Sequence, residues 1–191
     1  MKSQKLICVI DVQNDFIDGS LRNEEAIKVV PNIVKYLEEN IENAFLACTL
    51  DTHDKNYLLS PEGKKLPVEH CIKGTDGHNI NKDVMEVIRK YQELGKAAFI
   101  EKPTFGADPN DWERVLNRLY GLSTISEFNF NCDVEFVGFC TDICVVSNAL
   151  MLKALDTGLN ISVIKDLCAG VTPEKHEAAL EVMRSCQIEV K

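Results

Sequence analysis

Short apolar runs alternate with amphipathic stretches along most of the chain. Five apolar runs have the length of buried strands, at residues 6–10, 44–50, 97–100, 134–137 and 161–164. Apolar residues recur at helical spacing in five further stretches, at residues 26–37, 84–94, 111–119, 143–155 and 173–183. This alternation predicts an α/β protein with a doubly wound, mostly parallel sheet that carries helices on both faces.

Length and composition narrow the class of protein. A chain of 191 residues is expected to form a single domain, over residues 1–191, with a core that needs no disulfide or metal to fold. The net charge of −9 and the pI near 5.0 argue against a nucleic-acid surface and favour a small-molecule partner. No run approaches the roughly 18 apolar residues of a membrane span, and the polar residues 1–5 leave no room for a secretory signal before the first strand. We therefore expect a cytoplasmic protein.

The eight cysteines are expected to be reduced thiols. Six of them lie within or beside apolar runs, where cysteine serves as a small hydrophobic residue: Cys8, Cys48, Cys132, Cys140, Cys144 and Cys168. The chain contains no Cys-x-x-Cys pair, which excludes a zinc ribbon and a thioredoxin-type motif.

Residues 52–81 break the alternation of strands and helices. This stretch is rich in Lys, Gly, Pro and His and shows no periodicity. Loops of this length in compact domains are uncommon unless they are functional or disordered. The segment is therefore a candidate for a functional loop.

Four reactive sites follow the ends of predicted strands: Asp11, Asp51, Lys102 and the turn from Cys140 to Cys144. Ligands of open α/β sheets bind beyond the carboxyl ends of the strands, so we expect these side chains to converge there. A buried carboxylate beside a lysine can take the proton of a cysteine nucleophile. Cys144 also heads an apolar helical stretch, and a helix N-terminus favours thiolate. Each residue alone fits an ordinary structural role, and only their joint placement indicates an enzyme.

Three segments resemble the motifs of the isochorismatase-like cysteine hydrolases, the superfamily of nicotinamidases and N-carbamoylsarcosine amidases. They are Asp11-Val-Gln-Asn-Asp-Phe16, the lysine of Ile100-Glu-Lys102-Pro, and Gly138-Phe-Cys-Thr-Asp-Ile-Cys144. The resemblance implies a six-stranded sheet and a catalytic triad of Asp11, Lys102 and Cys144. It also implies a cis peptide between Phe139 and Cys140, and an oxyanion hole from the N–H groups of Cys140 and Cys144.

The long loop resembles the metal-binding branch of that superfamily, the nicotinamidases. Asp51-Thr-His53 follows the second strand, Glu62 lies within Ser60-Pro-Glu-Gly, and His70 precedes Cys71. Two imidazoles and two carboxylates can bind a divalent metal, with zinc expected first and manganese or iron as alternatives. A solvated role for Glu62 is an even alternative to ligation.

The resemblance also indicates where an aromatic substrate ring would bind. Phe16 matches one wall of the pocket, and Phe105 is a candidate for lining it. The position that many nicotinamidases fill with an aromatic residue is Leu66 here, so part of the stacking contact is lost.

The sequence therefore predicts a cysteine-dependent amidohydrolase, with nicotinamide as the first candidate substrate. Hydrolysis of another small amide or of an N-carbamoyl or ureido compound is the main alternative. A non-catalytic ligand-binding or interaction protein is an alternative of another class, and isochorismate hydrolysis is the weakest. Relatives commonly form dimers or tetramers, so the resemblance implies a homo-oligomer.

Overall fold

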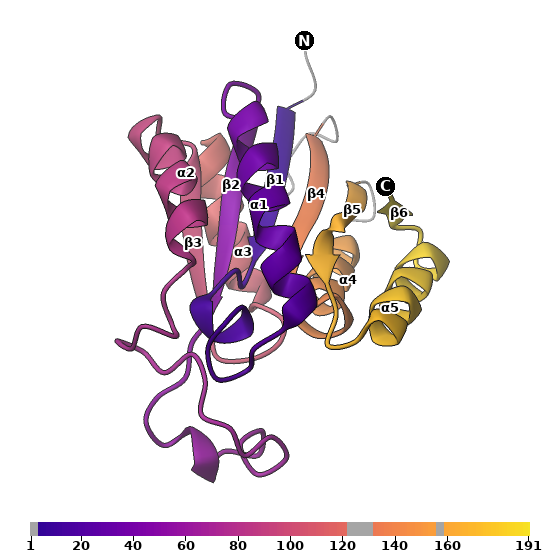
Figure 1. The fold of residues 1–191 in the computed structure, drawn as a ribbon. Helices are drawn as coiled ribbons and strands as arrows, with labels where there is room; N and C mark the ends of the chain where they lie inside the picture. Colours follow the sequence, from indigo (N-terminus) through magenta and orange to yellow (C-terminus); the bar gives the residue numbers. More distant parts are fainter. Residues whose placement is uncertain (1–3, 122–131, 156–158) are drawn as a thin grey trace.

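Six parallel strands form one sheet in the computed structural model, which describes residues 4–121, 132–155 and 159–191. The strand order is β3-β2-β1-β4-β5-β6 (Figure 1). The strands are β1 (Gln4–Ile10), β2 (Ala44–Asp51), β3 (Ala97–Lys102), β4 (Cys132–Phe139), β5 (Asn160–Ala169) and β6 (Glu189–Val190). Each pair of neighbours runs parallel. The predicted doubly wound sheet is confirmed.

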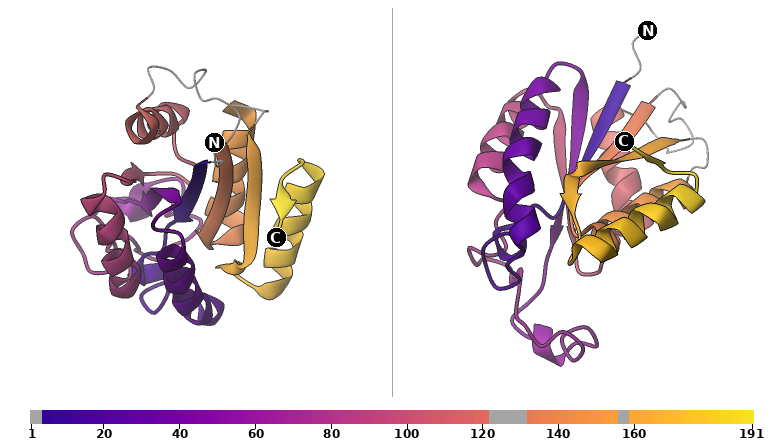
Figure 2. Two further views of the ribbon diagram at one scale, coloured as in Figure 1. Left: turned by 90° about the horizontal axis from the view of Figure 1, so that it is seen from above. Right: turned by 45° about the vertical axis from the view of Figure 1, so that its right-hand side comes forward.

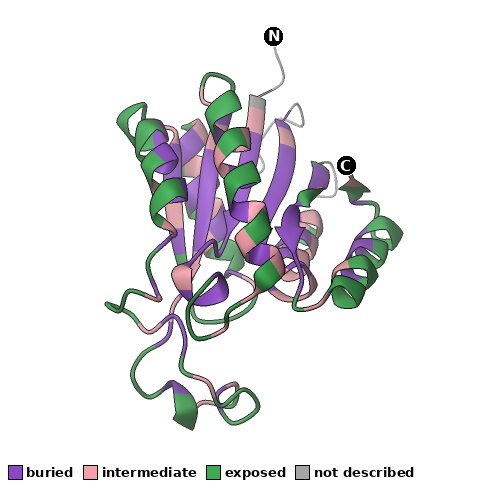
Figure 3. Ribbon diagram, viewed as in Figure 1, coloured by how far each residue is buried: buried purple, intermediate pink, exposed green. Residues whose placement is uncertain are grey.

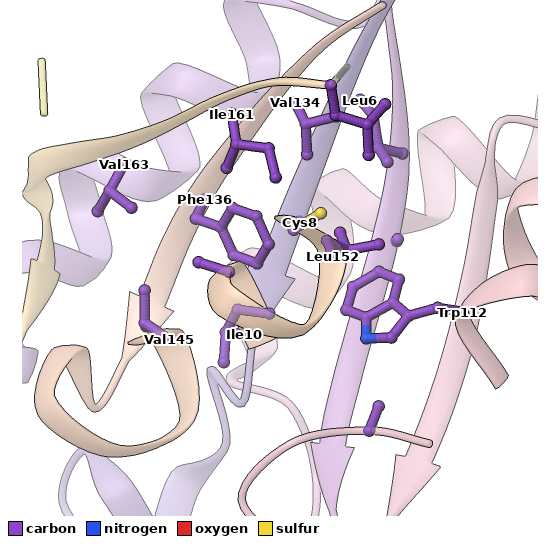
Figure 4. Packing of buried hydrophobic residues seen from close by; sticks show 14 of the residues in the cluster. Leu6, Cys8, Ile10, Trp112, Val134, Phe136, Val145, Leu152, Ile161 and Val163 are labelled. Carbon is purple, nitrogen blue, oxygen red and sulfur yellow. The ribbon is translucent and has the colours of Figure 1, made fainter. Parts of the chain in front are cut away.

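Helices cover both faces of the sheet, which the two further views show (Figure 2). They are α1 (Glu24–Glu39), α2 (Lys82–Glu93), α3 (Pro109–Tyr120), α4 (Val146–Leu155) and α5 (Pro173–Ser185). Side chains alternate between the two faces of a strand, and β1 is buried on both. Ile7 and Val9 pack with α1 and α2, whereas Leu6, Cys8 and Ile10 pack with α3, α4 and α5 (Figure 4).

Polar side chains cap the helices at their N-termini. Asn23 accepts hydrogen bonds from two N–H groups of α1, and Asn81, Asp108 and Thr172 each accept one at the start of α2, α3 and α5. Such caps satisfy backbone donors that a helix cannot satisfy internally. The helices therefore begin within a few residues of the predicted positions, and their outer faces are exposed (Figure 3).

The structure differs from the sequence prediction at two elements. Strand β6 spans only two residues, Glu189–Val190, beside β5, which is too short for an apolar run to reveal. The helix predicted to begin at residue 143 instead begins with a π-helical turn, η4 (Thr141–Val145), that continues into α4. Cys144 therefore lies inside the first turns of the helical segment, not ahead of them.

The long loop at 52–81 projects from the body of the molecule (Figure 1). Apart from one short turn, η2 (Tyr57–Leu59), it holds only two isolated bridges, His53 to Ile72 and Gln13 to Ile80. No helix within the described ranges is long and apolar enough to cross a membrane. All eight cysteines are unpaired, as expected.

Candidate active site

The strand order reverses between β1 and β4, and the reactive side chains gather at that point. Asp11 directly follows β1, and the turn that carries Cys144 follows β4. Asp51 and Lys102 are the last residues of β2 and β3, where the parallel register pairs them side by side. This switch point is where open α/β sheets bind ligands.

The three residues of the predicted triad are in contact. Lys102 Nζ lies 2.7 Å from Asp11 Oδ2 and 3.5 Å from Cys144 Sγ, and the Lys102 and Asp11 side chains are fully buried. Asp11 is near enough to the Cys144 thiol for its negative charge to raise the thiol pKa. Thr49 Oγ1 donates to the other oxygen of Asp11, Oδ1, at 2.6 Å. A carboxyl, an ammonium and a thiol that lie at or just after the ends of three strands therefore share one buried cluster.

Burial and mutual charge set the protonation of this cluster. Burial opposes the charge of Lys102, but the carboxylates of Asp11 and Asp51 outweigh it and raise the Lys102 pKa. Burial, together with Asp11, raises the pKa of the Cys144 thiol well above its ordinary value. The expectation of a thiolate stabilised by the helix N-terminus is therefore wrong for the resting protein. The raised pKa favours the protonated thiol of Cys144 over the thiolate.

The turn that presents Cys144 requires a glycine at position 138. Gly138 has φ of +117°, and a Cβ there would lie 2.1 Å from the carbonyl oxygen of Ile10 on the neighbouring strand. No other residue fits this close approach. The peptide between Phe139 and Cys140 is cis, as the resemblance implied. Cys140 and Cys144 both line the cavity.

Three of the four predicted metal ligands converge next to the triad. Atoms of Asp51, His53 and His70 that can bind a metal all lie within 4.8 Å of one another, and the three residues are buried. Asp51 Oδ2 lies 3.1 Å from His53 Nε2 and 3.4 Å from His70 Nε2. Glu62 lies at the margin, with Oε1 3.9 Å from His53 Nε2.

Hydrogen bonds to groups around the cluster orient His70 and Asp51. His70 Nδ1 lies 2.8 Å from the carbonyl oxygen of Val68, which makes Nδ1 the donor and leaves Nε2 free to bind a metal. The His53 and His70 hydrogen bonds and the nearby Lys102 outweigh burial and lower the pKa of Asp51. A carboxylate with two imidazoles is a donor set suited to zinc, so the residues present fit such an ion.

A cavity of about 810 Å³ opens onto both groups of residues. The three predicted substrate residues, Phe16, Leu66 and Phe105, line it together with Cys140, Cys144, Asp51, Glu62 and His70. Phe16 is buried and its ring centroid lies 5.7 Å from that of His70, whereas Leu66 and Phe105 are exposed. Asp11, Lys102 and His53 do not line this cavity, but Lys102 contacts Cys144 and Asp11, and His53 contacts Asp51.

Sequence reasoning missed the buried polar residues that support the site. Gln13 accepts a hydrogen bond from the N–H of Asp51 and donates to its carbonyl oxygen. Asp15 accepts from the N–H of Cys71, next to His70. Asn148 donates to the carbonyl oxygen of Cys144. Gln13 and Asp15 stand in the Asp11–Phe16 motif, which was a signal, but Asn148 lies within an apolar helix that gave none.

Comparison with known proteins places the chain in a family. The isochorismatase domain family matches residues 5–190. An isochorismatase family protein of Bacillus subtilis is 30% identical over 92% of this chain and 91% of its own length. The nicotinamidase/pyrazinamidase of Mycobacterium tuberculosis is 29% identical over 97% of each chain. The structure of a Pyrococcus horikoshii pyrazinamidase in complex with zinc matches with a TM-score of 0.75 and 26% identity, over 98% of each chain. The protein therefore belongs to the isochorismatase family.

Proposed function

We propose that this protein is a cysteine-dependent amidohydrolase that converts nicotinamide and water to nicotinate and ammonia. The observation that carries the proposal is the contact of Lys102 with both the Cys144 thiol and the Asp11 carboxylate, beside the cavity that Cys144 lines. The names of the aligned relatives, nicotinamidase and pyrazinamidase, support an aromatic carboxamide as the substrate.

Asp11 acts as the proton carrier in this reaction. It takes the thiol proton as Cys144 Sγ attacks the amide carbon, and it gives that proton to the departing nitrogen. Ammonia leaves and a thioester to Cys144 remains. Asp11 then takes a proton from the attacking water, and the carbon–sulfur bond breaks as Asp11 returns that proton to Cys144 Sγ. The acid product leaves and loses its proton to solvent as nicotinate. Lys102 stays protonated throughout and balances the charges of Asp11 and the sulfur.

The turn between β4 and α4 supplies the oxyanion site. The N–H groups of Cys140 and Cys144 are the donors that we assign to the negative oxygen of each tetrahedral intermediate. Backbone donors at the start of a helical segment are suited to that charge. The neighbouring Phe16, Leu66 and Phe105 would hold the ring of the substrate in the cavity.

Asp51, His53 and His70 would hold a divalent metal, with zinc as our first assignment and Glu62 at the margin of the set. A bound metal would supply a Lewis acid beside the amide and help to hold the ring nitrogen. The chain's own contribution is to hold the three ligands together, with Asp51 and His70 lining the cavity. Asp51 also contacts Lys102 of the triad.

The cellular setting follows from the same proposal. A small soluble amide fits a cytoplasmic enzyme, and eight unpaired cysteines are compatible with a reducing compartment. A homo-oligomer, as a dimer or tetramer, and a single domain over residues 1–191 remain expectations from the sequence.

Ammonia release from a panel of amides tests the proposal. Wild-type protein loaded with zinc should release ammonia from nicotinamide, and Cys144→Ala should abolish release while the far-ultraviolet spectrum stays unchanged. Release only from an N-carbamoyl amino acid, by a protein that binds no metal, would replace the substrate with the rival class. No release from any amide would refute the enzyme assignment.

A further inference from the structure

A buried amide joins the nucleophile to the wall of the cavity. Asn148 is fully buried in α4, one turn after Cys144. Its Oδ1 accepts hydrogen bonds from the N–H of Ala107 at 2.9 Å and from Trp112 Nε1 at 3.2 Å. Its Nδ2 donates to the carbonyl oxygens of Phe105 at 3.1 Å and of Cys144 at 2.8 Å. Both donors and both acceptor sites of the amide are therefore used.

Two of the partners of Asn148, Phe105 and Ala107, lie in residues 104–107, which we call the wall segment because Phe105 lines the cavity. Lys102 Nζ also donates to this segment, to the carbonyl oxygen of Thr104 at 3.1 Å. The side chain of Phe105 faces the cavity and is 48% exposed, so core packing does little to hold it. The position of its ring depends on the backbone, and Asn148 holds that backbone at both Phe105 and Ala107.

We propose that Asn148 is a positioning residue that fixes the Phe105 wall of the substrate cavity at a set distance from the Cys144 nucleophile. The role of the wall in substrate binding rests on the proposed amidohydrolase function. The link between Phe105 and Cys144 rests on the four hydrogen bonds alone.

Only an amide can make these four bonds at this place. Aspartate has the same shape and keeps the two acceptor contacts, but it lacks both donors and would set a carboxylate oxygen against two carbonyl oxygens. Buried groups that lose their partners carry the desolvation cost in full. Asn148→Asp therefore breaks the bonds to the carbonyl oxygens of Phe105 and Cys144, and keeps the bonds from Ala107 and Trp112.

Trp112 provides the matched control. Its indole is fully buried in the core beside Leu152 (Figure 4). Its Nε1 donates a hydrogen bond to Asn148 Oδ1, the oxygen that also accepts from Ala107. Trp112→Phe removes this donor and some core volume, so it lowers stability. It leaves the bonds from Asn148 to Phe105 and Cys144 in place.

The experiment is a double-mutant cycle on amide hydrolysis. Asn148→Asp and Trp112→Phe are each made alone and with Phe105→Ala, and kcat and KM for nicotinamide are measured for all. We expect Asn148→Asp to lower kcat/KM by about tenfold to a hundredfold. Phe105→Ala should add little to that loss, because both changes remove the same placed ring. In the Trp112→Phe protein, Phe105→Ala should have its full effect. Equal losses from Asn148→Asp and Trp112→Phe, or additive losses with Phe105→Ala, would overturn the proposal.

A second measurement does not depend on any amide substrate. Iodoacetamide is allowed to alkylate each protein, and the modified cysteine peptides are followed by mass spectrometry with exposed Cys186 as the internal reference. Asn148→Asp should change the alkylation rate of Cys144 by more than about threefold, since it removes the hydrogen bond that holds the Cys144 carbonyl, whereas Trp112→Phe should leave the rate unchanged. An unchanged Cys144 rate in Asn148→Asp would contradict the link to the nucleophile. If the wild type hydrolyses no amide, the proposed function fails, but the alkylation rates still test the link between Asn148 and Cys144.

If Asn148→Asp does not fold, Asn148→Ser, which leaves room for water, replaces it in the kinetic cycle with the same expectation.

Discussion

The ammonium of Lys102 lies 3.6 Å from Oδ1 of Asp51, while the other oxygen of Asp51 faces His53 and His70. The register of β2 and β3 makes this contact, because it pairs Asp51 directly with Lys102. One carboxylate therefore belongs both to the surroundings of the triad and to the proposed metal site. Predictions for the two sites follow from their shared boundary.

Replacement of Asp51 should remove metal binding. Asp51→Asn keeps the shape but weakens the central ligand of the cluster, so zinc content after dialysis should fall to near zero. His78→Asn is the control, since His78 is also buried in the long loop but lies outside the Asp51–His53–His70 cluster. Elemental analysis of both proteins decides, and equal zinc in the two variants would speak against the assigned ligands.

Removal of the triad ammonium should destabilise the fold. Lys102→Met leaves the carboxylate of Asp11 fully buried without its cation, and we expect a loss of about 3–5 kcal/mol in the free energy of unfolding. The double variant that adds Asp11→Asn should recover part of this loss, because the unpaired charge is gone. Urea denaturation at neutral pH measures both, and full additivity would show that the two residues do not interact.

The anchor of the metal loop should control metal affinity. Asp15 accepts hydrogen bonds from the N–H groups of Cys71 at 2.7 Å and Ser20 at 3.0 Å, and it thereby holds the backbone next to His70. We expect Asp15→Ala to weaken zinc binding by about tenfold to a hundredfold. Competition with a fluorescent chelator gives the dissociation constant. Asp18→Ala changes an exposed aspartate three residues after Asp15; it is the control and should leave the dissociation constant unchanged.

The buried carboxylate of Glu135 should make the stability of the protein depend on pH. Burial alone would raise the pKa of Glu135, but the hydrogen bond from Tyr36 and the ion pairs with Lys5 and Lys191, at 3.0 and 3.2 Å, lower it below its ordinary value of 4.5. A group with a lowered folded pKa stabilises above that ordinary value and loses its contribution as pH falls through the folded pKa.

The test compares wild type with Glu135→Gln. The stability difference between the two proteins should be largest above about pH 5 and should shrink as the pH is lowered towards about 3. Urea unfolding at several pH values gives this difference. A difference that stays constant over the range would show that Glu135 titrates normally.

The strong periodicity of the strands and helices made most of the fold predictable. The resemblance implied a sixth strand, but β6 could not be located because Glu189 and Val190 carry no pattern, and only pairing with β5 defines them as a strand. The protonation of Cys144 was misjudged for a similar reason. Local sequence indicates a helix start, whereas burial beside Asp11 is a property of the assembled site.

The chemistry-bearing residues could be predicted because strand ends of a parallel sheet meet at one edge. Asp11, Lys102 and Cys144 were found in this way, and the Asp-x-His pair at Asp51 pointed to the metal cluster. Gln13 stands in a recognisable motif, but its role and that of Asn148 could not be predicted, since both act through hydrogen bonds to backbone atoms of segments distant in sequence. Such partners exist only once the fold has formed.

The identity of the nucleophile is tested most directly by trapping the covalent intermediate. Zinc-loaded protein is mixed with nicotinamide, quenched in acid within the first turnover, and digested for peptide mass spectrometry. Our account predicts a nicotinoyl adduct on the Cys144 peptide of the wild-type protein, and no adduct in Cys144→Ala. Hydrolysis that persists in Cys144→Ala, or an adduct on another residue, would contradict it.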